Sequence, residues 1–130
     1  SRKAVSRSNP NPSNQKRALE SPEKVQAIRT VLWSLWPPSL RNAGKINDFN
    51  QFSNLTLPID QIDVPTLIIH GTEDVNVEFS HGKLLADTIP NAQFYIIKGG
   101  DHMMPFTHKE EVNKIISEFV QNVSVQDKNM

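Results

Sequence analysis

The sequence contains no cysteine among its 130 residues. This absence excludes disulfide bonds, a cysteine nucleophile and zinc sites built from thiolates, and it fits a reducing compartment. Neither sign of charge is in excess, because 14 Lys and Arg residues balance 14 Asp and Glu residues. A balanced charge does not favour a nucleic-acid or acidic-membrane partner.

Long hydrophobic segments are missing as well. No apolar run approaches the length of about 18 residues that a membrane-spanning helix needs. The N-terminal segment has no apolar stretch of the kind found in secretory signal peptides. We therefore expect a soluble, cytoplasmic protein with no membrane and no nucleic-acid partner.

Glycine is scarce, with five residues at positions 44, 71, 82, 99 and 100. None of them is spaced to frame a G-x-S-x-G turn, the motif that presents a catalytic serine between a strand and a helix. The four histidines lack the H-x-x-x-H and H-E-x-x-H spacings of common metal sites. We expect neither a metal nor another cofactor.

Both ends of the chain have the composition of flexible segments. Residues 1–17 are rich in Ser, Asn and Pro and carry basic residues without an acid, which predicts a flexible basic leader. A nucleic-acid-binding arm is an alternative, but the basic residues are scattered and no aromatic residue lies among them. Residues 122–130 are mostly polar and predict a flexible tail.

Residues 18–57 contain one clear helix signal. Ser21 suits the N-cap and Pro22 the first helical position, and Pro37 with Pro38 ends the segment. Apolar residues recur between them at helical spacing: Val25, Ile28, Leu32, Leu35 and Trp36. Residues 39–57 hold isolated apolar residues among Asn, Gly, Asp and Ser, so we predict mostly loop with room for one short turn of helix.

Residues 58–121 alternate between strand and helix patterns. Residues 66–70 and 93–98 are apolar runs typical of buried strands, and residues 79–89 form a helical pattern between them. Thr107 and Glu110 have the spacing of a capping box, which precedes an apolar stripe through Val120. Strand, helix, strand and helix in this order predict an α/β fold with parallel strands and a right-handed crossover.

Asp74 and His102 each follow one of the two predicted strands. Parallel strands end at the same edge of a sheet, where ligands of such folds gather, so the two side chains are expected to meet. A carboxylate that holds one imidazole nitrogen fixes the tautomer and leaves the other nitrogen to act as a base. The alternatives are that Asp74 only forms a turn and that His102 only ends a strand.

The other histidines have simpler interpretations. We expect His70 to be a strand-end residue with a local hydrogen bond, and His81 and His108 to be exposed at helix starts. Met103, Met104 and Phe106 either line an acyl pocket or pack against the last helix.

The stretches "VPTLIIHGTEDVNV", "LADTIPNAQFYIIKGGDHMM" and "EEVNKIISEFV" resemble the C-terminal part of the α/β-hydrolase fold family. In that family an apolar strand leads to the triad acid in a G-x-x-D motif, and a later strand leads to a Gly-rich turn and the triad histidine. The resemblance implies that Asp74 is the acid and His102 the base. It covers residues 58–121, with Asp101 and Glu78 standing where the family more often has Gly and Pro.

The resemblance implies further that residues 18–57 are a cap-like segment and that the nucleophile precedes Asp74 in the chain. Ser80 follows the acid, which is the wrong place. We therefore expect the C-terminal portion of a serine-type hydrolase of esters, thioesters or related acyl compounds, inactive alone. The alternatives are a non-catalytic binding module and a hydrolase with an aspartate nucleophile, such as a dehalogenase or an epoxide hydrolase.

The expected sheet is too small to be stable alone. Three or more strands are normally needed, and apolar central strands would expose their edges. We expect the chain to pair with a missing N-terminal half or to self-associate through its strand edges.

Overall fold

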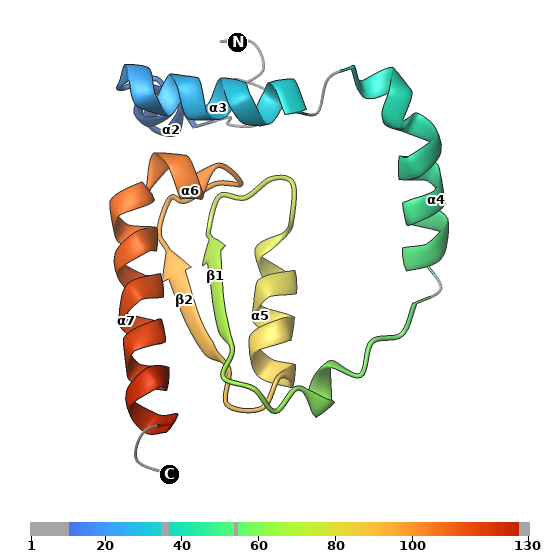
Figure 1. Ribbon diagram of the computed structural model, residues 1–130, viewed down its shortest axis with the longest axis vertical. Coiled ribbons are helices and arrows are strands. Elements are labelled where there is room, and N and C mark those ends of the chain that lie inside the picture. Colours follow the sequence, from blue (N-terminus) through green and yellow to red (C-terminus); the bar gives the residue numbers. More distant parts are fainter. Residues whose placement is uncertain (1–10, 35–36, 54, 128–130) are drawn as a thin grey trace.

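The structure is a computed structural model that describes residues 11–34, 37–53 and 55–127. Figure 1 shows its elements. In chain order they are α2 (Pro12–Ala18), α3 (Pro22–Ser34), η1 (Pro38–Arg41), α4 (Asn42–Phe52), η2 (Ile59–Gln61), β1 (Leu67–Gly71), α5 (Phe79–Thr88), β2 (Gln93–Ile97), α6 (Met104–Thr107) and α7 (Lys109–Asp127).

β1 and β2 pair in parallel, with Leu67 opposite Gln93 and Gly71 opposite Ile97. α5 is the crossover between the strands, and α5 and α7 flank them on opposite sides (Figure 1). The predicted α/β order with parallel strands is therefore confirmed. α2 and α3 lie across the end of the sheet at which both strands terminate.

The predicted flexible leader is wrong for its second half, because residues 12–18 form α2. Asn11 caps this helix by accepting a hydrogen bond from the Ser13 N–H at 2.8 Å, and Pro12 occupies the first turn. Ser, Asn and Pro are common in flexible segments, which is why composition predicted one here. The same residues also begin helices, so composition alone does not separate the two. Residues 1–10 of the predicted leader lie outside the described residues.

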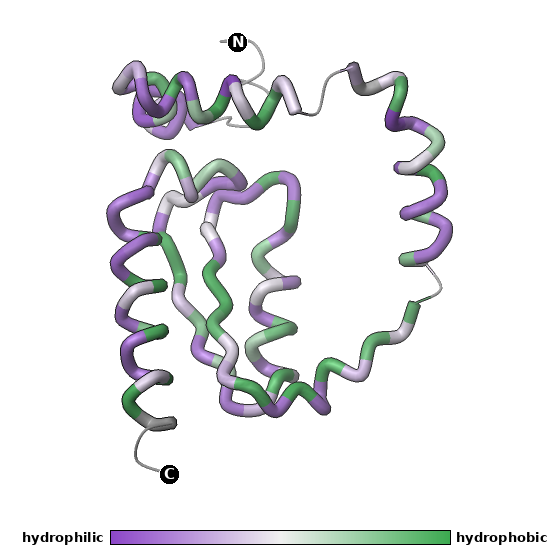
Figure 2. The backbone as a smooth tube through the Cα atoms, viewed as in Figure 1, coloured by the Kyte–Doolittle hydropathy of each residue, from purple (hydrophilic) through white to green (hydrophobic). Residues whose placement is uncertain are grey.

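The expected loop over residues 39–57 is also wrong, because α4 occupies much of it. Ile46, Phe49 and Phe52 are spaced by three residues and are all exposed. α4 stands apart from the sheet (Figure 1), and its hydrophobic positions are coloured green along the backbone tube in Figure 2. The helical period was present in the sequence, but only a few apolar residues marked it.

The last helix begins and ends at other residues than expected. Thr107 ends α6 and its hydroxyl lies 3.3 Å from the Met103 carbonyl oxygen, so it does not form the predicted capping box. α7 then continues to Asp127, which removes residues 122–127 from the predicted tail. Residues 128–130 lie outside the described part of the chain.

Few apolar side chains are fully buried in the described residues. Ala18 of α2 and Ile28 of α3 pack together in one small cluster, and Ile97 of β2 is fully buried as well. The strands were expected to be buried on both faces, but Leu67 to Ile69 are only half-buried and Tyr95 and Ile96 are exposed. None of the helices in the described ranges is both long and apolar enough to cross a membrane.

Candidate active site

The loops that follow β1 and β2 are bonded to each other. The Thr72 N–H donates to the Ile97 carbonyl at 3.1 Å, and the Glu73 N–H donates to the Gly100 carbonyl at 2.8 Å. The Gly99 N–H in turn donates to the Thr72 hydroxyl at 2.9 Å. The two loops are therefore held side by side at the carboxyl end of the sheet.

Glycine is required where these loops cross. A Cβ atom on Gly71 would lie 2.2 Å from the Gly100 carbonyl oxygen, a separation that no side chain can occupy. Gly99 has a φ of +71°, in the left-handed region that glycine adopts without strain. The glycines thus allow close contact of the backbones and a sharp exit from β2.

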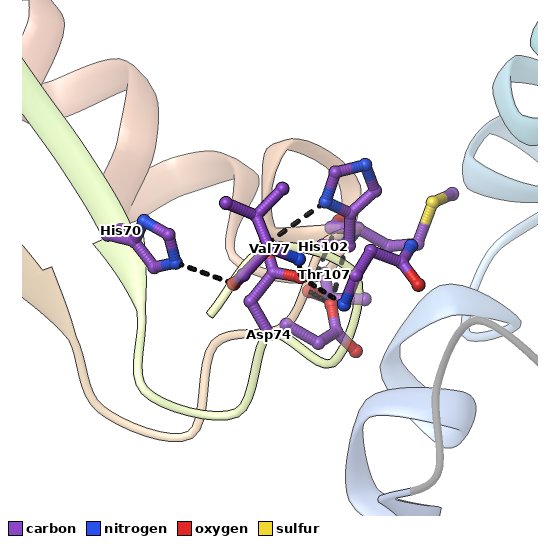
Figure 3. A network of polar contacts seen from close by, with 8 residues as sticks. His70, Asp74, Val77, His102 and Thr107 are labelled. Atoms are coloured by element: carbon purple, nitrogen blue, oxygen red, sulfur yellow. Dashed lines mark hydrogen bonds and ion pairs between the residues drawn. The ribbon is translucent and has the colours of Figure 1, made fainter. Parts of the chain in front are cut away.

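Asp74 and His102 meet across this junction, as Figure 3 shows. The Oδ2 atom of Asp74 lies 3.0 Å from Nδ1 of His102. The Oδ1 atom accepts hydrogen bonds from the backbone N–H groups of Asn76, at 2.8 Å, and Val77, at 3.0 Å. Asp74 therefore forms a turn with one oxygen and contacts the histidine with the other, so the two predicted roles do not exclude each other.

The carboxyl group of Asp74 is well suited to remain charged. Burial by itself raises its pKa, but hydrogen bonds from the Val77 N–H, His102 and the Asn76 N–H outweigh burial and lower the pKa from its ordinary value. Only 6% of the Asp74 side chain is exposed, against 47% of the His102 side chain. A buried anion thus contacts an imidazole that opens to solvent.

This contact determines the tautomer of neutral His102. A carboxylate can only accept a hydrogen bond, so Nδ1 must carry the proton that it donates to Asp74. Nε2 then keeps its lone pair. The arrangement can accept a proton at Nε2 and stabilise the resulting imidazolium beside Asp74.

His70 has the structural role expected from its position. It is buried at the end of β1, and its Nε2 lies 3.1 Å from the Val77 carbonyl oxygen (Figure 3). Its ring also packs edge-on against Phe79, with 5.6 Å between ring centroids. His70 therefore holds Val77, whose N–H in turn contacts Asp74. In this way His70 supports the loop that follows β1.

Asp101, which stands where the family more often has glycine, is completely buried. Its Oδ1 atom accepts a hydrogen bond from the Met103 N–H at 2.9 Å, while Oδ2 has no hydrogen-bond partner among the described residues. Burial raises the pKa of this carboxyl, although the hydrogen bond from the Met103 N–H acts against the increase. Asp101 thus shapes the turn that carries His102.

His108 was expected to be exposed, but only 8% of it is accessible. Its Nδ1 lies 2.9 Å from the Thr107 hydroxyl, and its Nε2 lies 2.5 Å from Nη1 of Arg17. Arg17 can only donate, so Nε2 accepts and Nδ1 donates to Thr107. Burial and the adjacent Arg17 lower the pKa of His108. The pattern gave no sign of this contact, because Arg17 is 91 positions away.

The remaining candidates do not join the Asp74–His102 pair. Met103 and Phe106 pack against Ala18 and Ile28, which supports core packing over an acyl pocket. Ser80 is exposed in the first turn of α5, with its hydroxyl 3.4 Å from Glu78. Within the part of the chain that the structure describes, no three His, Asp or Glu side chains gather as metal ligands.

Comparison with known proteins identifies relatives of this chain. A family model described as Serine hydrolase (FSH1) matches residues 14–115. The chain is 34% identical over 98 residues to the bifunctional esterase/perhydrolase DCH of Acinetobacter calcoaceticus, covering 71% of the chain and 35% of that protein. It is 40% identical over 63 residues to a poly(3-hydroxyalkanoate) depolymerase of Ectopseudomonas oleovorans, covering 48% and 22%.

A solved structure is also similar. A bromoperoxidase from Bacillus anthracis overlaps 48% of this chain and 23% of its own, with 41% sequence identity and a TM-score of 0.47.

The chain matches only a part of each relative's length. The chain spans between 22% and 35% of the length of the curated relatives that it matches. The family model nevertheless covers most of the chain, including both loops of the site. The match confirms the resemblance to the α/β hydrolases, and the chain belongs to the serine hydrolase (FSH1) family.

Proposed function

We propose that this chain supplies the acid and the general base of a serine-type hydrolase, with Asp74 as the acid and His102 as the base. The observation that carries the proposal is the 3.0 Å contact between a buried carboxylate and a half-exposed imidazole. A contact made only for stability has no need to leave one face of the ring open.

The geometry supports a defined sequence of proton transfers. Asp74 holds the Nδ1–H of His102, so Nε2 removes the proton from a serine hydroxyl as that oxygen attacks an acyl carbon. The imidazolium then protonates the leaving group through the same nitrogen, and an acyl-enzyme remains. Water repeats the cycle, with His102 again as base, and releases the acid product.

The nucleophile and the oxyanion hole are proposed to come from outside this chain. No G-x-S-x-G motif is present, and Ser80, in the first turn of α5, follows the acid in the chain instead of preceding it. The membership of a serine hydrolase family favours serine over the aspartate of dehalogenases and epoxide hydrolases. The chain alone would therefore have little or no activity, because the nucleophile and oxyanion donors provide much of the rate enhancement.

The substrate class proposed is an ester, a thioester or a related acyl compound. This proposal takes support from the relative named an esterase/perhydrolase. The partner proposed is the remaining portion of the hydrolase, which would bring its serine to the exposed face of His102. Self-association through the strand edges is the alternative.

Labelling with a fluorophosphonate probe tests the proposal. The probe reacts only with a serine that a base activates, so the complete hydrolase should be labelled and the 130-residue chain alone should not. His102→Ala in the complete hydrolase should abolish labelling and reduce kcat by several orders of magnitude, on the order of 10³ or more.

His81→Ala is the matched control, because His81 is an exposed histidine on α5. It should leave labelling and kcat unchanged. Activity retained in the His102→Ala variant would reject His102 as the base, and labelling of the chain alone would reject an external nucleophile.

A further inference from the structure

We propose that Asn14 is a positioning residue for His102: it holds the turn after β2 so that the imidazole stays in contact with Asp74. The proposal rests on the proposed function of this pair. It concerns a residue of α2, a helix that lies some 60 to 90 positions from the residues that it contacts.

One face of α2 and its N-cap touches both loops of the site. Asn11, Asn14 and Arg17 are spaced by three residues and so lie along one side of the helix. Asn11 donates to the Glu73 carboxylate at 2.5 Å, Asn14 donates to the Gly99 carbonyl at 2.6 Å, and Arg17 lies 2.5 Å from His108. Glu73 is adjacent to Asp74, while Gly99 and His108 lie on either side of His102.

Asn14 is the buried member of this set. It is 2% exposed, whereas Asn11 is half-buried and Arg17 exposed. A polar side chain is rarely buried without a specific partner, because it gives up its hydrogen bonds to water. The partner of the Asn14 amide is the carbonyl of Gly99, at the start of the turn that leads to His102.

The contact connects Asn14 to both loops through a single peptide group. The Gly99 carbonyl accepts a hydrogen bond from Asn14, and the Gly99 N–H donates to the Thr72 hydroxyl in the loop that follows β1. Its positive φ orients these two groups, and Gly100 then contacts Gly71. Losing the Asn14 contact would free this peptide, and the displacement would reach His102 three residues later.

A purely structural role for Asn14 predicts a different set of results. An anchor of α2 would affect stability while the folded fraction kept a normal His102–Asp74 contact. A positioning residue changes the imidazole itself. The two are separated by the ring ¹⁵N shifts of His102, which report whether the proton is on Nδ1 or Nε2, and by the separate effects on kcat and KM.

The test compares Asn14→Asp with Asn14→Ala in the complete hydrolase. Asp keeps the shape of Asn but cannot donate to Gly99, and Ala removes the group without introducing charge. Both variants should shift the His102 tautomer away from the Nδ1–H form. Both should also lower kcat about tenfold to a hundredfold, the effect of misplacing a catalytic group by about 1 Å, with a smaller change in KM.

Ser13→Ala is the matched control on the same helix, since Ser13 is exposed. It should leave the ring shifts and kcat unchanged. The proposal is rejected if either folded Asn14 variant keeps the wild-type ring shifts, whatever its activity, or if neither variant folds. The proposed function is rejected by a different result, which is activity retained in His102→Ala. The ring shifts of the Asn14 variants do not depend on that result.

Discussion

Asp74 shows at the residue scale that one side chain fulfils two interpretations of a sequence pattern. Its Oδ1 atom forms the turn that any loop aspartate favours, and its Oδ2 atom contacts His102. The pattern predicted both possibilities. The backbone N–H groups of Asn76 and Val77 fix the carboxylate in the orientation that makes the second contact possible.

Asp74→Asn should reduce kcat of the complete hydrolase by about 10³–10⁴, in line with acid-to-amide changes in other triads. The amide oxygen still accepts the two backbone bonds, so its NH₂ group faces His102. Nδ1 must then accept, which moves the proton to Nε2 and removes the base. Steady-state kinetics measure the effect.

Asp87→Asn is the matched control, because Asp87 is exposed on α5 and forms an ion pair with Lys83, away from the site. It should keep wild-type kinetics. A Asp74→Asn variant within tenfold of the wild-type kcat would contradict the assigned role of the acid.

His108 makes the stability of the fold depend on pH. Burial and the adjacent Arg17 lower its pKa in the folded chain below the ordinary value of 6.5, and Lys24 adds to this shift. The carboxylates of Glu111 and Asp101 act in the opposite direction without reversing it. The unfolded chain therefore binds the proton more tightly. The stabilisation is present above pH 6.5 and is lost as pH falls through the folded pKa.

Thermal unfolding of the complete hydrolase, at fixed protein concentration, measures this dependence. The Tm of the wild type should fall as pH drops below 6.5, and His108→Gln should have a flatter profile in that range. Ser13→Ala, which removes no titratable group, should keep the wild-type slope. Equal slopes in wild type and His108→Gln would show that His108 does not titrate with unfolding.

At the element scale, long apolar runs were predicted better than short helices. Residues 66–70 and 93–98 and the stripe of the last helix identified β1, β2 and α7, because burial against the sheet selects for apolar residues at a regular period. α2 and α6 have seven and four residues, too few for a period to show. α2 is stabilised by its N-cap Asn11 and by the contact of Asn14 with the turn after β2.

Gly71→Ala should destabilise the complete hydrolase by about 1–3 kcal/mol, the typical cost of overpacking. The added methyl would overlap the Gly100 carbonyl, and the backbone of the site loops would have to move. A lower Tm and a reduced kcat of the complete hydrolase are expected together.

Gly44→Ala serves as the control, because a Cβ there meets nothing within 4 Å and Gly44 lies inside α4. Alanine is the better helix former, so helix content by circular dichroism should hold or increase. A Gly71→Ala variant with wild-type Tm would contradict the close contact of the loops.

At the scale of the whole molecule, large apolar side chains are exposed on α3, η1, α4, α5, β2 and α7. Large apolar side chains more than a third exposed include Trp33, Phe49, Phe52, Leu84 and Tyr95. Two strands form the sheet in the described residues, fewer than a stable sheet normally needs. This surface fits a chain that spans a quarter to a third of its relatives.

Size-exclusion chromatography with light scattering should therefore show that the chain alone associates. Addition of the remaining portion of the hydrolase should replace these assemblies by a defined complex, because we propose that this portion covers the same strand edges. A monomeric chain with cooperative unfolding would contradict the proposed dependence on a partner.

The sequence by itself determined the parallel order of strands and the positions of Asp74 and His102 at their ends. Local periodicity and turn chemistry act within a few residues, and parallel strands must end at the same edge. Only the tertiary structure decided that Asn14 contacts Gly99, that Arg17 contacts His108, and that Asp101 is buried. These contacts join residues up to 91 positions apart, and no local pattern encodes which distant backbone groups a folded chain brings together.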